Sequence, residues 1–286
     1  MSRWLLTALL PVLLLPWSVL AFDLQVSPHR VRDGAAFLVR LAAPDLVSGH
    51  IRFLDREYPF EAVSEEARVL VPVPIDSHAG TMPLDLVYLD RQGRRHRIGT
   101  AVEVVSGDYP VERLTLPERM VSPRRPEVVE RIRREQARLE RLFAQVTPAR
   151  FWQGVVAPVD DPVGSRFGRR RILNGKPRSP HGGVDFRSPR GRQVRSPAAG
   201  RVVLADDLFF TGNTLVIDHG GGLFSILAHL QDSLVREGSD VVAGQVVGTV
   251  GATGRATGPH LHWTLRLRRV KVDPLAVLAL FNRGSP

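Results

Sequence analysis

Short runs of alternating apolar and polar residues fill the chain from residue 22 to residue 108. Examples are AAFLVRLAA, ARVLVPVPID and PLDLVYLD, and turn-forming residues separate such runs about every ten positions. A period of two is that of a strand with one buried face, because successive side chains point to opposite sides. The pattern therefore predicts a small N-terminal β domain over residues 22–108, similar to an antiparallel β-sandwich.

The period changes in residues 109–150. Apolar residues there recur about every 3.6 positions, and charged residues occupy the other faces. Ser122 and Pro123 precede the pattern as helix-start signals, and Pro148 ends it. We expect a helix from about Pro126 to Gln145 within a helical linker at residues 109–150. The apolar positions of this helix are Val128, Val129, Ile132, Leu139, Leu142 and Phe143.

Residues 151–286 return to short runs that are bounded by glycines. GRVVLADD, NTLVIDHG, LFSILAHL, DVVAGQVVGTV and HLHWTLRL are strand candidates. Together they predict a compact antiparallel β domain with many tight turns. The whole chain is thus expected to be all-β, with a β-sandwich-like N-terminal domain, a helical connector and a second β domain.

The first 21 residues have the pattern of a secretory signal peptide. Arg3 precedes an apolar run, and Val19 and Ala21 satisfy the small-residue rule for cleavage before Phe22. The alternative is an uncleaved membrane anchor, but the run of about 17 residues is at the lower limit for crossing a bilayer. We expect a periplasmic or secreted protein with no stable membrane span after cleavage.

Composition narrows the chemistry further. The chain has no cysteine, which excludes disulfides, thiolate metal ligands and a cysteine nucleophile. The net charge is +10, mostly from arginine. The basic residues are scattered and form no nucleic-acid-binding motif, so we expect no nucleic acid and favour an anionic envelope partner. A composition that is simply rich in arginine explains the charge equally well.

Two short segments gather residues that can bind a metal ion. SPHGGVDF contains His181 and Asp185, and TGPHLHW contains His260 and His262. Residues i and i+2 of a strand share a face, so His260 and His262 point into one cleft if HLHWTLRL is a strand. A catalytic zinc has three protein ligands and one open position. His181, Asp185 and one of the other two histidines would supply such a set.

From residue 151 to about residue 275, the sequence resembles the lysostaphin-like, LytM-type zinc endopeptidases of peptidoglycan. The resemblance rests on SRFGRRR, SPHGGVDF, VRSPAAGRVV, GNTLVIDHGGGLFSILAHL and VGATGRATGPHLHW, which occur in the family's order. The preceding β domain and helix are similar to those of secreted proteobacterial members. The resemblance implies a compact antiparallel β fold with a narrow groove over the metal.

The resemblance also implies a role for five side chains. His181, Asp185 and His262 would bind one Zn²⁺, and His229 and His260 would be catalytic histidines on its open side. The activity implied is hydrolysis of stem peptides or cross-links in peptidoglycan, with the D-alanyl-diaminopimelate bond as the candidate. The division of proton transfer between His229 and His260 stays open.

Some positions depart from the family or have ordinary explanations. Many members have a tyrosine two residues before the histidine of the AHL block, where this chain has Leu227. His219 is expected to be structural. Arg170 and Arg178 are candidates for binding a substrate carboxylate, and Asn174 is first of all a turn residue.

Two alternative functions remain from the sequence. One is a catalytically inactive relative that binds and activates another wall hydrolase, although such relatives lack metal-site residues. The other is a secreted protease that acts on proteins.

Overall fold

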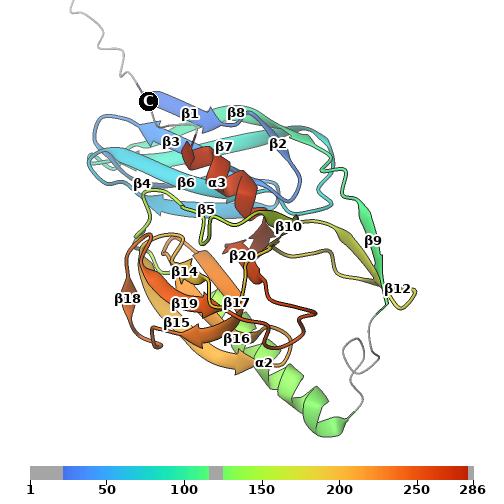
Figure 1. Cartoon of the computed structure of the whole chain (residues 1–286). Helices are drawn as coiled ribbons and strands as arrows, with labels where there is room; N and C mark the ends of the chain where they lie inside the picture. Colours follow the sequence, from blue (N-terminus) through green and yellow to red (C-terminus); the bar gives the residue numbers. More distant parts are fainter. Residues whose placement is uncertain (1–21, 116–124, 283–286) are drawn as a thin grey trace, which may run out of the picture.

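The computed structural model describes residues 22–115 and 125–282 (Figure 1). The expected signal peptide at residues 1–21 lies outside the described residues. No helix within the two described ranges is long and apolar enough to cross a bilayer. Two β-rich parts lie one above the other, and the architecture agrees with the predicted all-β class (Figure 1).

The N-terminal part is a pair of sheets around one apolar core. Phe37 of one sheet meets Phe53 of the other edge-to-face at 5.0 Å between ring centroids, and both rings are fully buried. All pairs are antiparallel except β2–β8, which is parallel. One sheet has the order β1 (Asp23–Ser27), β3 (Ala36–Ala42), β6 (Glu66–Pro72). The other has the order β2 (Arg30–Arg32), β8 (Arg95–Val105), β7 (Gly80–Asp90), β4 (Leu46–Phe53), β5 (Arg56–Glu61).

The segment expected to be a helical linker contains both a strand and a helix. Strand β9 (Val111–Leu114) pairs in parallel with β11 (Arg170–Leu173), which pairs with β12 (Lys176–Arg178). Helix α2 (Pro126–Ala144) matches the prediction to within one residue. Its Phe143 packs edge-to-face on Phe224 at 5.4 Å, which attaches the helix to the C-terminal sheet.

The C-terminal part is one strongly bent sheet. Trp263 and Leu265 are fully buried at its centre. Its main path runs β10 (Val163–Ser165), β13 (Val184–Phe186), β20 (Leu261–Leu267), β17 (Leu223–Ser233), β16 (Gly212–Asp218), β15 (Gly200–Leu208), β18 (Asp240–Val241). Off this path are β14 (Gln193–Arg195), β19 (Val246–Val250) and β21 (Val270–Val272).

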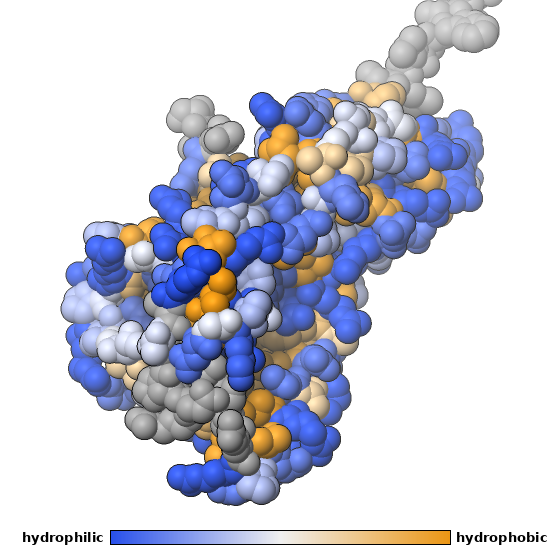
Figure 2. All heavy atoms as spheres, turned by 90° about the vertical axis from the view of Figure 1, so that its right-hand side faces the viewer, coloured by the Kyte–Doolittle hydropathy of each residue, from blue (hydrophilic) through white to orange (hydrophobic). Residues whose placement is uncertain are grey.

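A second helix, α3 (Pro274–Asn282), was not expected from the sequence. It lies against β3 of the N-terminal part and β20 of the C-terminal part (Figure 1). Ala276 packs on the N-terminal core and Val277 belongs to the C-terminal core, so the helix joins the two cores. Figure 2 shows a side face of the molecule on which hydrophilic residues dominate and apolar residues form small groups.

Candidate metal centre

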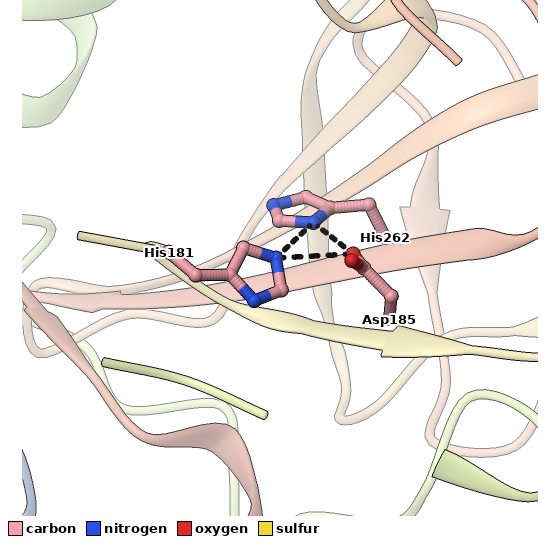
Figure 3. A group of neighbouring side chains, drawn as sticks. All are labelled: His181, Asp185 and His262. Atoms are coloured by element: carbon pink, nitrogen blue, oxygen red, sulfur yellow. Dashed lines mark hydrogen bonds and ion pairs between the residues drawn. The ribbon is translucent and has the colours of Figure 1, made fainter. Parts of the chain in front are cut away.

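Three of the predicted metal ligands meet at one point. Asp185 of β13 lies directly opposite His262 of β20 in the antiparallel register, and His181 comes from the loop before β13 (Figure 3). Nε2 of His181 is 3.1 Å from Oδ1 of Asp185 and 3.2 Å from Nδ1 of His262. Nδ1 of His262 is 2.6 Å from the same carboxylate oxygen. The structure therefore brings these three side chains together from residues that are 81 positions apart.

Glycine makes the close approach of the two strands possible. A Cβ at Gly183 would overlap the backbone carbonyl of Trp263 and the hydroxyl of Thr264. The loop before it is fixed by the backbone of His181, whose N–H donates to the carbonyl of Arg169 at 2.9 Å. Its own carbonyl accepts from Gly168 at 2.8 Å. His181 is 2% exposed, so the imidazole is held in a packed setting.

The outer nitrogens of the two ligand histidines have their own partners. Nδ1 of His181 donates to the carbonyl of Arg166 at 2.9 Å, because a carbonyl oxygen can only accept. Nε2 of His262 lies 2.9 Å from the hydroxyl of Thr264, to which it can donate. These assignments leave one lone pair of each imidazole directed inward, next to the carboxylate of Asp185. Three acceptor atoms so close together require a positive charge among them, either a proton or a metal ion.

The ionised form of Asp185 is strongly favoured over the protonated form. Burial raises the pKa of Asp185, but its interactions with the adjacent imidazoles of His181 and His262 outweigh burial and hold that pKa well below its usual range. Nη2 of Arg171 lies 3.8 Å from Oδ2 of Asp185. Arg171 in turn lies beside Glu112 of β9, at 3.6 Å between its Nε and a carboxylate oxygen. The site thus combines an ionised carboxylate with two imidazoles.

His229 and His260 form a second pair beside the ligand cluster. Their ring centroids are 4.6 Å apart, and His229 lies 6.1 Å from His262. Nδ1 of His229 donates to the carbonyl of Thr253 at 2.8 Å, and Nδ1 of His260 donates to the carbonyl of Gly258 at 2.9 Å. Both hydrogen bonds leave Nε2 as the acceptor, which is the atom available for proton transfer.

The backbone of His229 is strained. Its φ of 61° is in the left-handed region, which an imidazole-bearing residue adopts at a cost of about 1–2 kcal/mol. The strain occurs where β17 shifts register against β16, and a bulge of this kind re-aims a side chain. His229 is 7% exposed. Burial lowers its pKa to about 4, against a smaller opposing effect of the hydrogen bond to Thr253.

The ligand set suits zinc. Ligands at about 2.0–2.1 Å from a tetrahedral zinc ion are about 3.3 Å apart. Two of the three separations, 3.1 Å and 3.2 Å, are close to that value. The third, 2.6 Å, is a hydrogen-bond distance and has to widen when the ion binds. Two imidazoles, one carboxylate and hydrogen-bonded outer nitrogens are the donors and supports expected at a zinc site.

Other residues singled out in the sequence lie elsewhere or have structural roles. His219 is fully buried, and its nitrogens contact the carbonyl of Ala199 at 2.9 Å and the hydroxyl of Ser225 at 2.8 Å. Leu227, at the position of the family's tyrosine, is fully buried in the core. Arg170 forms an ion pair with Asp76 of the N-terminal part.

Arg178 is exposed on β12, and Asn174 takes a left-handed turn conformation with φ 50°. The structure thus places neither of these two residues among the ligands.

Two supports of the ligands were not identified from the sequence. Thr264 follows His262 by two positions, so the same period of two that pairs His260 with His262 could have indicated it. The other support, the carbonyl of Arg166, is a backbone group, so no pattern of side chains in the sequence predicts its contact with His181.

The segment that contains this site is similar to known proteins. Residues 179–274 match peptidase family M23. The peptidoglycan DD-endopeptidase ShyA of Vibrio cholerae is 40% identical over 121 residues, which are 41% of this chain and 28% of that protein. The murein hydrolase activator EnvC of Escherichia coli is 36% identical over 124 residues, which are 43% of this chain and 27% of that protein. The chain therefore covers about a quarter of the length of these two relatives.

A solved structure extends the likeness to both β-rich parts. A Pseudomonas aeruginosa protein described as a peptidase M23 is 29% identical and superposes with a TM-score of 0.63, covering 87% of this chain and 95% of that one. The arrangement of an N-terminal β-rich part on this kind of domain therefore recurs in another protein.

Proposed function

From the match of residues 179–274 to peptidase family M23, we propose that the protein is a zinc-dependent endopeptidase of peptidoglycan. The observation that carries the proposal is the convergence of three inward-facing acceptor atoms beside two further imidazoles. His181, Asp185 and His262 are the proposed zinc ligands. Zinc in such a site supplies a Lewis acid that polarises a carbonyl group and lowers the pKa of a water molecule.

The proton chemistry falls to His229 and His260. Because the pKa of His229 is about 4, its imidazole is neutral at neutral pH and its Nε2 is free to accept a proton. Once protonated, this buried imidazolium is stabilised by the negative charge of Asp185. The acid form can then return the proton to the leaving amine, as general acid–base catalysis requires. His260 offers a second Nε2 acceptor, because its Nδ1 also donates to a backbone carbonyl.

The proposed substrate is a stem peptide or cross-link of peptidoglycan, with the D-alanyl-diaminopimelate bond as the first candidate. The name of the relative ShyA, a peptidoglycan DD-endopeptidase, supports this choice. The proposed location is the periplasm or the outside of the cell, reached through a signal peptide at residues 1–21. We further propose the division into an N-terminal domain at 22–108, a linker at 109–150 and a peptidase domain at 151–286.

A second candidate function is suggested by the relative EnvC, which is named as a murein hydrolase activator. An activator needs a binding groove but no metal ligands. The presence of all five candidate side chains in one cluster favours the enzyme, because an activator gains nothing from an ionised carboxylate among imidazoles.

The test combines metal analysis with digestion of purified peptidoglycan. The enzyme is expected to contain one zinc per chain and to release muropeptides that mass spectrometry identifies as products of one peptide-bond cleavage. His262→Ala should lose both zinc and activity, whereas His229→Ala should keep zinc and lose activity. No zinc in the wild type, with binding to peptidoglycan retained, would leave the activator function instead. Cleavage of a glycine-rich protein but not of peptidoglycan would indicate a general protease.

A further inference from the structure

The segment that leaves the N-terminal part lies beside the loop of residues 166–169, between β10 and β11, which is hydrogen-bonded to His181 and is called the metal-site loop below. Residues 107–114 connect β8 to the residues before α2, and β9 pairs in register with β11. The N–H of Arg170 donates to the carbonyl of Pro110 at 3.0 Å. The carboxylate of Glu112 lies beside Arg169 and Arg171, at 3.7 Å and 3.6 Å. The start of the linker therefore packs against the residues next to the metal site.

Tyr109 of this segment fills a space that three glycines keep open. A Cβ at Gly34, Gly107 or Gly168 would overlap the ring or hydroxyl of Tyr109. Gly34 and Gly107 come from the N-terminal part, and Gly168 comes from the metal-site loop. Phe167 completes the contact, with its ring edge-to-face to Tyr109 at 6.2 Å between centroids. One phenol ring of the linker thus contacts both the N-terminal part and the metal-site loop.

The hydroxyl end of Tyr109 is anchored in the N-terminal part. It donates to the backbone carbonyl of Asp33. Asp33 is 4% exposed, and its carboxylate accepts hydrogen bonds from the backbone N–H groups of Gly107 and Asp76. Asp76 also pairs with Arg170 beside the linker. The support behind the ring is therefore buried and hydrogen-bonded, which makes it rigid.

The other side of the ring meets the metal-site loop. Phe167 and Gly168 lie in this loop, between β10 and β11, and Gly168 donates to the carbonyl of His181 in the loop before β13. The backbone carbonyl of Arg166 accepts a hydrogen bond from ring Nδ1 of His181, and the backbone carbonyl of Arg169 accepts one from the backbone N–H of His181. A shift of residues 166–169 would move these three hydrogen bonds of His181 at once.

We propose that Tyr109 is a positioning residue for His181, so that the N-terminal part is a structural component of the metal site. Tyr109 does not contact the ligand atoms; it holds the loop whose backbone orients the imidazole. The inference rests on the proposed function only in assigning His181 as a zinc ligand. Supports of this kind typically change metal affinity about 10–100-fold when they are removed.

The test uses the full-length mature chain and two readouts. In Tyr109→Ala, zinc affinity measured by competition with a chromophoric chelator should fall about tenfold. In the zinc-free protein, hydrogen exchange of the peptide that contains His181 should quicken, while exchange in β17 residues 223–228 stays unchanged. Tyr109→Phe keeps the ring and should stay close to the wild type in both readouts. Leu84→Ala, a fully buried change in the N-terminal core, should lower the unfolding temperature without altering zinc affinity.

Each outcome has one meaning. If Tyr109→Ala destabilises the protein as Leu84→Ala does but keeps wild-type zinc affinity and His181 exchange, Tyr109 is only a packing residue and the inference is wrong. If Tyr109→Ala does not fold, Tyr109→Leu takes its place with the same expectations. If the wild type binds no zinc, the proposed function fails, whereas faster exchange at His181 in the variant still supports the positioning role.

Discussion

The hydroxyl of Thr264 offers a sharp test of how His262 is prepared for a metal ion. It lies 2.9 Å from Nε2 of His262 and is 4% exposed. Thr264→Val keeps the shape of the side chain but removes the acceptor. The imidazole proton is then more stable on Nδ1, where it can be donated to the carboxylate of Asp185 at 2.6 Å. That proton occupies the lone pair that a zinc ion needs.

Binding zinc to this variant requires the proton to return to an Nε2 that has no partner. A buried N–H without an acceptor costs about 1–3 kcal/mol, and 1.4 kcal/mol corresponds to about a tenfold change in an equilibrium constant. We therefore expect zinc to bind about 10–100-fold more weakly, which agrees with the usual effect of losing such a support.

The assay is competition for zinc with a chromophoric chelator at pH 7.5, after circular dichroism has confirmed that the variant is folded. Thr264→Ser keeps a hydroxyl and serves as the matched control, with an affinity close to that of the wild type. If Thr264→Val binds zinc within twofold of the wild type, the hydroxyl does not set the tautomer of His262 and the reasoning is refuted.

Three further predictions concern other parts of the domain. His229→Ala should bind zinc normally but hydrolyse peptidoglycan about 10²–10⁴-fold more slowly, because a general acid–base is lost; normal turnover would exclude a catalytic role. Burial lowers the pKa of His219 to about 4. As the pH falls from 6.5 toward 4, the unfolded chain therefore binds a proton at His219 that the folded protein does not bind. This difference lowers the free energy of unfolding. Between pH 7.5 and 5, urea unfolding should show a loss of about 2 kcal/mol in the wild type beyond that in His219→Gln, and equal losses in both would contradict the shift. Gly183→Ala places a methyl group against the carbonyl of Trp263 and should reduce both folding yield and zinc content, so a stable variant with full zinc would show that β13 and β20 tolerate separation.

The origin of the ligand cluster differs from residue to residue. His260 and His262 share a face because residues two apart in any strand do so, and this follows from local geometry alone. The pairing of Asp185 with His262 depends on the register of β13 against β20, which the alternation within each strand does not specify. Only the resemblance to a known family indicated in advance which of the two histidines faces the carboxylate.

The sequence by itself determined the period of each segment, the helix expected from about Pro126 and the lack of cysteine ligands, since these follow from composition or from residues a few positions apart. The full set of five candidate side chains came from the resemblance to a known family. Tertiary structure alone decided that β9 pairs with β11, that α3 joins the two cores, and that Tyr109, Thr264 and the carbonyl of Arg166 support the metal site. The physical reason is that these contacts join residues distant in the chain or use backbone atoms common to every residue. Their partners are chosen by packing of the whole molecule, which no local pattern records.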